Sequence, residues 1–389
     1  MSRLASFLCS VFAATALLTA AAAHSQTYLL TDLGTLGSFQ SYGTGISATG
    51  QVTGYGFSPF VASDRAFRST ASGVSPVKLT DIGALGGVSS HGNGINASGQ
   101  VTGDGNLGGD GSYHAFRSAA SGMALGNTDL GTLGGTYSTG YGINATGQVV
   151  GKSDTGGNST YHAFRSSANG SVVLTDLGTL GGTYSGGNGI NDLGETTGFA
   201  AKANNATSHA FRSSVSGAAV VSLTDLGTLG GTYSGGNGIN ASGQVTGDSG
   251  TIFNTNHAFR SSASGSPLVL TDLGTLGGSS SSGRSINASG MVVGASATAA
   301  NVGHAFLYNN TEMLDLNTLV TNLGGFVLVN AYGINDAGAI TGTGNINGET
   351  HAYRLDPRVG SATPEPGTLA LFAAFALTGA GFARKRRRK

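Results

Sequence analysis

The chain repeats three short motifs seven times, and this periodicity constrains the fold more than any other feature of the sequence. A TDLGTLGG motif, a GINASGQV motif and a HAFRS motif follow one another in that order; we call them the DLG, GIN and HAF motifs. Successive HAF motifs, the first at Arg65 and the last at His351, lie 47 to 49 residues apart. A period of this size is typical of stacked supersecondary units, which bury their apolar faces only against one another. The repeat therefore predicts one continuous array over residues 26–357.

Each unit contains four short strand candidates. In the fourth unit they are Val172–Leu180, Gly189–Asn191, Glu195–Phe199 and His209–Ser213. The Asn-Ala-Ser-Gly tetrad of the GIN motif predicts a tight hairpin turn, because Asn and Gly accept left-handed backbone. The HAF motif alternates an aromatic residue with small or polar ones, as a half-buried strand does. Four strands at a period near 47 residues are typical of a propeller blade.

The order in which the motifs begin and end favours a ring. The chain enters on a DLG motif, Tyr28–Leu36, and leaves on a HAF motif, His351–Leu355. If blades are counted from the GIN hairpin, the last blade lacks its DLG strand, and the N-terminal copy can supply it and cover a free edge. We therefore predict an all-β fold, a seven-bladed β-propeller of four-stranded blades closed by the N-terminal strand. A solenoid with two coils per unit is the alternative.

Both ends of the chain differ from the repeat. Residues 1–25 predict a signal peptide, with a basic start, an apolar run and small residues before the expected cleavage site. The only cysteine, Cys9, lies in this segment, so the mature chain is expected to have no disulfide. At the other end, residues 358–366 predict a linker and residues 367–383 a short transmembrane helix. A basic tip follows, expected on the cytoplasmic side: Arg384, Lys385, Arg386, Arg387, Arg388 and Lys389.

Two resemblances follow from these motifs. The sequence Pro364, Glu365, Pro366, followed by the short apolar span and the basic tip, resembles the PEP-CTERM sorting signal of Gram-negative bacteria. This resemblance implies an exosortase-type processing enzyme in the inner membrane as a partner, and an association with exopolysaccharide and biofilm. The repeat resembles the HAF family of extracellular repeat proteins, named for residues such as His114-Ala115-Phe116. An ordinary C-terminal membrane anchor is the alternative for the tail.

Together the resemblances imply export. The protein would be held transiently in the inner membrane by its C-terminal helix and then reach the cell surface or the extracellular space. Neither resemblance implies a defined reaction. The charge of the chain makes one class of partner unfavourable. Without Arg3 and the basic tip 12 basic residues remain, whereas 18 acidic residues remain without Glu365. A net negative body argues against nucleic acid as a ligand.

The repeated aspartates of the DLG motif are interpreted as structural. Copies spread one per blade around a ring do not converge on a substrate, and identical surroundings do not single out one copy for catalysis. We expect these carboxylates to bond to the backbone or a neighbouring strand, with the arginines of the HAF motif as candidate partners. The aspartates are Asp32, Asp81, Asp129, Asp176, Asp225, Asp272 and Asp315; the arginines are Arg68, Arg117, Arg165, Arg212, Arg260 and Arg354.

The sequence predicts no catalytic, cofactor or metal site. Asp104, Asn106 and Asp110 superficially resemble a calcium loop. An EF-hand loop requires an oxygen ligand at its fifth position and Glu at its twelfth, where this chain has Gly108 and Ala115. We interpret the segment as a polar, glycine-rich loop, and the many glycines of the chain as turn residues.

The segment between the GIN and HAF motifs varies in every unit, and it is the more informative part of the repeat. In a propeller this loop and the TLGGTYSGG segment are expected on one face. That face would carry Tyr137, Tyr184 and Tyr233 among Gly, Ser and Thr. Aromatic platforms with polar neighbours suit weak carbohydrate binding, and loops on a rigid scaffold often carry function. These tyrosines are therefore candidate glycan contacts, and turn filler is the alternative.

We predict a non-catalytic structural or adhesive protein, with exopolysaccharide as the candidate ligand. One alternative is a secreted polysaccharide hydrolase or lyase, for which Glu195, Glu312 and Glu349 are the non-repeated acidic candidates. A second alternative is ice binding, which requires a flat threonine array. The repeated threonines would form one only in a solenoid: Thr35, Thr132, Thr179, Thr228 and Thr275.

Overall fold

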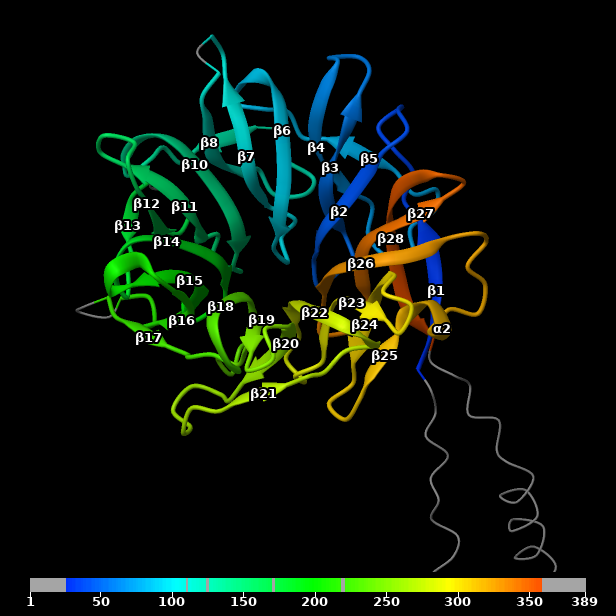
Figure 1. Cartoon of the computed structure of the whole chain (residues 1–389). Helices are drawn as coiled ribbons and strands as arrows, with labels where there is room; N and C mark the ends of the chain where they lie inside the picture. Colours follow the sequence, from blue (N-terminus) through cyan, green and yellow to red (C-terminus); the bar gives the residue numbers. More distant parts are fainter. Residues whose placement is uncertain (1–25, 110, 124–125, 170–171, 218–220, 359–389) are drawn as a thin grey trace, which may run out of the picture. The chain divides into compact units, whose positions relative to one another are not determined.

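The computed structural model describes residues 26–358, apart from 110, 124–125, 170–171 and 218–220. The predicted signal peptide, the Pro364–Pro366 motif, the predicted membrane helix and the basic tip lie outside the described residues. Tyr28–Pro357 forms one compact unit, whose sheets are arranged around a common centre (Figure 1). In the part that the structure describes, no helix is both long and apolar enough to cross a bilayer.

The described chain is almost entirely β-structure. The strands of the first half are β1 (Thr27–Asp32), β2 (Ser41–Ile46), β3 (Val52–Ser58), β4 (Ser63–Ser69), β5 (Leu79–Asp81), β6 (Gly86–Ile95), β7 (Val101–Leu107), β8 (Tyr113–Ser118), β9 (Asn127–Asp129), β10 (Gly134–Ile143), β11 (Val149–Thr155), β12 (Tyr161–Ser166), β13 (Leu174–Asp176) and β14 (Gly181–Ile190).

The strands of the second half are β15 (Thr196–Lys202), β16 (Ser208–Ser213), β17 (Leu223–Asp225), β18 (Gly230–Ile239), β19 (Val245–Thr251), β20 (Asn256–Ser261), β21 (Leu270–Asp272), β22 (Gly277–Ile286), β23 (Val292–Thr298), β24 (Gly303–Tyr308), β25 (Met313–Asp315), β26 (Val327–Ile334), β27 (Ile340–Ile346) and β28 (Glu349–Arg358). Two short helical turns, η1 (Ala203–Asn205) and α2 (Leu316–Leu319), complete the elements.

The strands form sets of four, each of which combines the GIN and HAF strands of one unit with the DLG strand of another. Four sheets are β2–β5, β6–β9, β10–β13 and β14–β17, and a fifth has the order β1-β28-β27-β26. The sets β18–β21 and β22–β25 form one sheet because a single parallel bridge joins Asn256 to Ser280. The structure thus confirms an all-β, propeller-like fold of four-stranded sets. The first strand of the chain lies in the same sheet as the last three.

Two expected strand boundaries are wrong. The strand expected at Val172–Leu180 is only β13, and the one expected at Gly189–Asn191 is part of the ten-residue β14. The TYSGG segment is therefore a strand and not a loop. Its small, turn-like residues form a strand because β15 pairs along it, and because Ser185 accepts a hydrogen bond from the Ala163 backbone in the preceding sheet. Tertiary contacts here override local propensity.

The glycine of the QVTG segment also lies in a strand, so the expectation that glycines serve turns is wrong for this position. The seven copies are Gly54, Gly103, Gly151, Gly198, Gly247, Gly294 and Gly342. At Gly247 a Cβ atom would lie 1.8 Å from the carbonyl oxygen of Gly235 on the neighbouring strand. The neighbouring backbone leaves no room for a side chain. Close approach, not a turn, requires glycine here.

The hydrophobic core consists of small clusters between consecutive sheets. In one cluster Ala66 and Ile82 from the β2–β5 sheet pack against Ile95, Val101 and Phe116 from the β6–β9 sheet. The aromatic residue of the HAF motif is fully buried in every unit: Phe67, Phe116, Phe164, Phe211, Phe259, Phe306 and Tyr353. Burying one such side chain stabilises the fold by about 1.5–3 kcal/mol relative to leaving it exposed. No unit can bury its aromatic residue without a neighbour.

The arginines of the HAF motif do not pair with DLG aspartates, so that expectation is wrong. Arg117 Nη1 instead donates to the backbone carbonyls of Gly147 and Ser167, at 2.7 and 3.2 Å. Both carbonyls belong to the next unit, so these buried cations connect consecutive sheets. The last unit makes the same contact with the first, since Arg354 Nη1 donates to Gly50 O at 3.2 Å.

The asparagine of the GIN motif makes a second contact between units. Asn96 Nδ2 donates to the backbone carbonyl of Asn144, one unit along the chain, at 3.0 Å. From the last unit, Asn335 Nδ2 donates to the carbonyl of Ser47, in the first unit, at 2.9 Å. The contacts between neighbouring units therefore also join the two ends of the repeat array.

Candidate functional site

The DLG aspartates do not come together in one site. Asp129 accepts a hydrogen bond from the backbone N–H of Gly131 at 2.7 Å, and its carboxylate lies 2.9 Å from His114 Nδ1. The same His–Asp pair recurs in other units: His162–Asp176, His209–Asp225, His257–Asp272, His304–Asp315 and His351–Asp32. Asp81 pairs with Arg65 instead, at 3.1 Å. These pairs connect the third strand to the short outer strand, one pair per strand set.

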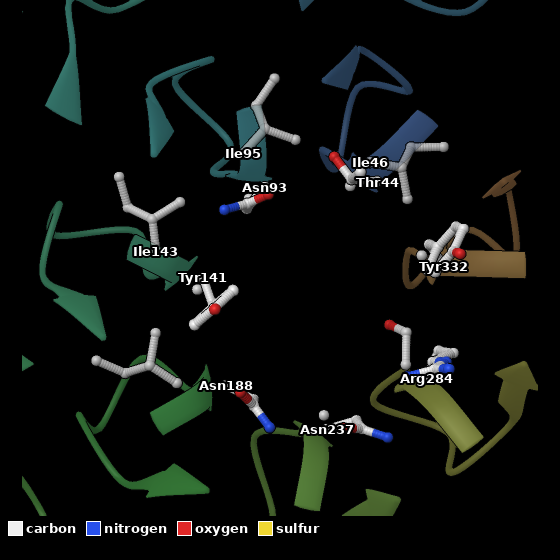
Figure 2. A pocket seen from close by; sticks show the side chains of 18 of the residues that line it. Thr44, Ile46, Asn93, Ile95, Tyr141, Ile143, Asn188, Asn237, Arg284 and Tyr332 are labelled. Atoms are coloured by element: carbon white, nitrogen blue, oxygen red, sulfur yellow. The ribbon is translucent and has the colours of Figure 1, made fainter. Parts of the chain in front are cut away.

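A cavity of about 560 Å³ lies at the centre of the ring of sheets (Figure 2). Three consecutive residues from each of seven strands line it; we call β2, β6, β10, β14, β18, β22 and β26 the inner strands. The third residue of each triplet is always isoleucine. The first residue varies, and we call these seven the rim residues: Thr44, Asn93, Tyr141, Asn188, Asn237, Arg284 and Tyr332.

Four rim residues bond to the neighbouring inner strand. Asn93 Nδ2 donates to the carbonyl of Gly140 at 2.9 Å, and Asn237 Nδ2 donates to that of Gly283 at 2.8 Å. Asn188 and Thr44 make the equivalent contacts with Gly236 and Gly92, at 2.9 and 2.7 Å. The asparagine and threonine side chains therefore serve packing between sheets. Tyr141, Arg284 and Tyr332 depart from this pattern.

The candidate tyrosines lie on inner strands and not in loops, which corrects their expected placement. Tyr137, Tyr184 and Tyr233 belong to β10, β14 and β18, each four residues before a rim residue. The strand register shifts at each rim residue, between Gly140 and Gly142 in β10, so regular alternation does not relate the two positions. Tyr137 is half exposed, at 50%, whereas Tyr184 and Tyr233 are partly buried.

Tyr137 and Tyr184 border an aromatic cluster between two sheets. Tyr161 on β12 lies 5.7 Å from Tyr184 between ring centroids, and each of these rings lies 6.5 Å from Phe199 on β15. The Nζ atom of Lys152 lies 5.6 Å from the centroid of Tyr161. Burial raises the pKa of the Tyr161 hydroxyl, and the Lys152 ammonium partly opposes that rise. The Tyr161 hydroxyl therefore stays protonated at neutral pH.

A hollow of about 330 Å³, which we call the aromatic cleft, opens beside this cluster. Its lining includes Tyr137, Thr139, Lys152, Asp154 and Tyr161. Aromatic faces stack on the apolar face of a sugar ring, and charged and hydroxyl groups bond to its hydroxyls. The variable loop borders the same end of the sheet, because the side chain of Asn158 accepts a hydrogen bond from the Thr136 backbone at 2.8 Å.

A second group of polar side chains, which the sequence analysis missed, surrounds His91 on β6. His91 Nδ1 lies 3.0 Å from the Asp104 carboxylate in its own sheet, and Nε2 lies 3.6 Å from Asp64 in the preceding sheet. The hydrogen bond to Asp104 raises the pKa of the His91 imidazole above its usual range, although burial acts in the opposite direction. His91 therefore retains its proton to higher pH than a free histidine.

Tyrosines enclose this histidine. The Tyr55 ring meets His91 edge-on with 4.7 Å between centroids, and it stacks on Tyr42 at 4.9 Å. Tyr113 lies on another side of the imidazole, at 6.5 Å. Burial and the neighbouring Tyr42 raise the pKa of the Tyr55 hydroxyl. Only this unit combines these side chains, which hold an imidazole, two carboxylates and three phenols close together.

The non-repeated glutamates do not converge with this group. Glu195 is buried and accepts hydrogen bonds from Asn191 at 2.8 Å and from Ser264 at 2.7 Å, a contact between sheets. Glu349 lies 3.5 Å from His351, and Glu312 is exposed in the turn before β25. Asp110 of the calcium-like loop lies outside the described residues. Among the residues that the structure describes, no group of three His, Cys, Asp or Glu side chains is suited to hold a metal ion.

The repeated threonines do not form the array that ice binding requires. The Thr132 hydroxyl donates to the carbonyl of Gly135 in its own turn, at 2.9 Å. Thr35, Thr179, Thr228 and Thr275 make the equivalent contact. Each lies at the edge of a different strand set, and the sets surround a centre instead of forming a flat solenoid (Figure 1).

No family model and no curated protein matches the chain. Among solved structures the chain is similar to a Trypanosoma rangeli sialidase, with a TM-score of 0.40 and 10% identity over 78% of this chain and 58% of that one. The same sialidase in complex with the inhibitor DANA gives a TM-score of 0.38 at 11% identity with the same coverage. The chain thus spans less than two thirds of that protein's length, and we draw no conclusion from a likeness this weak.

Proposed function

We propose that the chain is an exported, non-catalytic protein of the cell surface or extracellular matrix that binds polysaccharide. We further propose that its strand sets are the seven blades of a propeller closed by β1. The position of β1 beside β28, and the contacts from Asn335 to Ser47 and from Arg354 to Gly50, support closure. The signal peptide and the PEP-CTERM-like tail of the sequence support export and processing by an exosortase-type enzyme.

The aromatic cleft is the observation that carries polysaccharide binding. It combines a half-exposed tyrosine, a second tyrosine beside a lysine, and a carboxylate, in a hollow that opens to solvent. The side chains that form it are variable between units, whereas those that join the sheets are repeated. Variable groups on a fixed scaffold are where recognition is expected.

Retention on immobilised exopolysaccharide from the producing strain tests this proposal. The variant Tyr137→Ser with Tyr161→Ser introduces serines that other units already carry at these positions, Ser89 and Ser208, so it is expected to fold. Aromatic contacts contribute roughly 0.5–1.5 kcal/mol each beyond burial, so losing two should weaken binding about tenfold.

The matched control is Val173→Ser with Val269→Ser. It removes two exposed apolar side chains from the loops at the other end of the strands. The control should bind like the wild type. Equal retention of the cleft variant and the wild type would contradict the proposal, and so would equal losses in both variants.

A glycan-cleaving enzyme is the second candidate, and the group around His91 favours it. Asp104 holds Nδ1 of the imidazole, and its hydrogen bond raises the pKa of His91, which favours the protonated ring that a general acid requires. The assay is the release of new reducing ends or unsaturated ends from the same exopolysaccharide. Release by the wild type and its loss in His91→Asn, the residue at the equivalent position Asn330, would establish this function in place of the first.

A further inference from the structure

Arg284 differs from the other rim residues in its contacts. At the equivalent position, Asn93, Asn188 and Asn237 each donate to a carbonyl of the neighbouring inner strand. Arg284 has no such bond, and within the described residues no carboxylate lies within 4.0 Å of its guanidinium. Its Nε atom is buried and has no hydrogen-bond partner. A buried donor without a partner is costly, so hydrogen bonds within the described residues do not explain why an arginine stands at this position.

A hollow of about 480 Å³ lies beside Arg284, between the β18–β21 and β22–β25 strands. Small side chains leave this space open: Ser280 stands where other units have Tyr137 or Tyr184, and Ala295 stands where another has Phe199. Arg284 lines both this hollow and the central cavity, as the rim view in Figure 2 shows for the cavity. A ligand in either space therefore reaches its guanidinium.

The electrostatics of the central cavity favour a single anionic group, because Arg284 is the one charged residue among those that line it. Among the residues that line the two spaces Arg284 alone is basic and Asp248 alone is acidic, and Asp248 accepts hydrogen bonds from Ser282 and Asn237. Arg284 also lies over the Tyr332 ring, 5.9 Å from its centroid. A guanidinium beside an aromatic face binds a carboxylate through a planar pair of N–H donors while the ring of a sugar contacts the tyrosine.

The charge of the whole body limits the size of that anion. With 12 basic and 18 acidic residues between the two ends, the protein repels a long polyanion lying along its surface. A single carboxylate held locally by Arg284 is compatible with this charge. The ligand class is therefore a glycan with a carboxylated unit at the point of contact.

We propose that Arg284 binds the carboxylate of a uronic acid unit of the polysaccharide. This inference rests on the proposed function in that it takes the ligand to be a glycan, and it adds the class of sugar. The probe is a glucuronic acid-terminated oligosaccharide, and its matched counterpart is the same oligosaccharide with the carboxyl group reduced to an alcohol. Calorimetric titration of the mature chain with each gives the affinity ratio.

The wild type should bind the acidic form about tenfold more tightly or better, because a charge-assisted pair of hydrogen bonds is worth that much. In Arg284→Asn this preference should disappear while binding of the reduced form stays unchanged. Asn occurs at three equivalent positions, so the variant is expected to fold. Arg284→Lys keeps the positive charge but lacks the paired N–H donors of a guanidinium, so it should lose part of the preference for the acidic oligosaccharide. Lys78→Asn, a charge removal on an exposed loop, is the control.

Equal affinity of the wild type for the two oligosaccharides would overturn the inference, and so would an unchanged preference in Arg284→Asn or an equal loss in Lys78→Asn. These outcomes are independent of the test of the proposed function. If the Tyr137 and Tyr161 variant loses retention while Arg284→Asn keeps the wild-type preference, polysaccharide binding stands and only the uronic acid assignment fails. Loss of preference in Arg284→Asn with unchanged retention in the tyrosine variant would place binding at the rim instead of the aromatic cleft.

Discussion

Replacement of Gly247 by alanine tests the close approach between strands that the repeat requires. Gly247 lies on β19 opposite Gly236, and the register of the pair shifts directly after it, between Gly236 and Gly238. A Cβ atom at Gly247 would lie 1.8 Å from the carbonyl oxygen of Gly235 and 3.0 Å from the Cα atom of Gly236. All these atoms are backbone, so no side-chain rotation relieves the contact.

The magnitude follows from the displacement required. Ordinary van der Waals contact lies at 3.4 Å or more, so β18 and β19 must separate by more than an ångström at this point. Overpacking a well-packed interior costs about 1–3 kcal/mol and occasionally more, and we expect the upper end of this range because two backbones must move. For a folded unit of this size, a loss of about 3 kcal/mol lowers the thermal midpoint by roughly 3–5 °C.

Gly235→Ala is the matched control, because it lies one residue from the same contact. A Cβ at Gly235 would meet nothing within 4 Å, and its backbone is not in the left-handed region. This variant should be neutral or stabilised by about 0.4–1 kcal/mol through a less flexible unfolded chain. Denaturant unfolding of both variants measures the difference. Equal stabilities of Gly247→Ala and Gly235→Ala would refute the reasoning.

Two further predictions concern the core and the group around His91. Phe164→Ala removes a fully buried ring from a cluster with Leu130 and Val149, and it should lower the free energy of unfolding by about 3–5 kcal/mol in denaturant titrations; a loss below 1 kcal/mol would contradict the packing described. His91→Asn should lower stability most at low pH. The pKa of His91 is raised in the folded state. The stabilisation of the wild type over the variant should therefore be fully present below the unfolded pKa of about 6.5, and it should disappear as the pH rises through the folded pKa. A difference in stability that grows with pH would contradict this prediction.

The sequence was sufficient to predict the features that depend on local chemistry. The GIN hairpin is confirmed, since Asn96 N donates to Gln100 O across the Asn-Ala-Ser-Gly turn. The HAF strand and its buried aromatic residue are also confirmed, as at Phe116. These elements follow from turn residues and from alternation, which a single unit already contains. Placement of the first strand beside the last also followed from the order of the motifs.

The features that depend on contacts between units could not be derived from one unit. The TYSGG segment has turn-like residues but forms a strand because β15 pairs along it and Ser185 accepts a hydrogen bond from the preceding sheet. The arginine of the HAF motif was expected to pair with a DLG aspartate on an adjacent strand. Arg117 instead donates a hydrogen bond to a backbone carbonyl of the next unit. The His–Asp pair takes the place of that ion pair, because His114 and Asp129 face each other across adjacent strands.

The rim residues were missed for a different reason. The variable position directly before the GIN motif reads Thr, Asn, Tyr, Asn, Asn, Arg and Tyr in chain order, and it lies outside the variable loops from which the candidate contacts were predicted. Aligning the seven motifs would have shown this variation. That the position lines the central cavity, and that Arg284 there has a buried Nε without a partner, required the structure.

The central claim is that variable residues of the inner strands and of the aromatic cleft bind glycan while the repeated residues form the scaffold. Hydroxyl-radical footprinting of the mature chain, with and without exopolysaccharide from the producing strain, tests it most directly. We predict that the polysaccharide protects Tyr137 and Tyr161, and leaves the exposed Val173 and Val269 at the other end of the strands as reactive as before. Protection of the two valines with no protection of the two tyrosines would contradict the account.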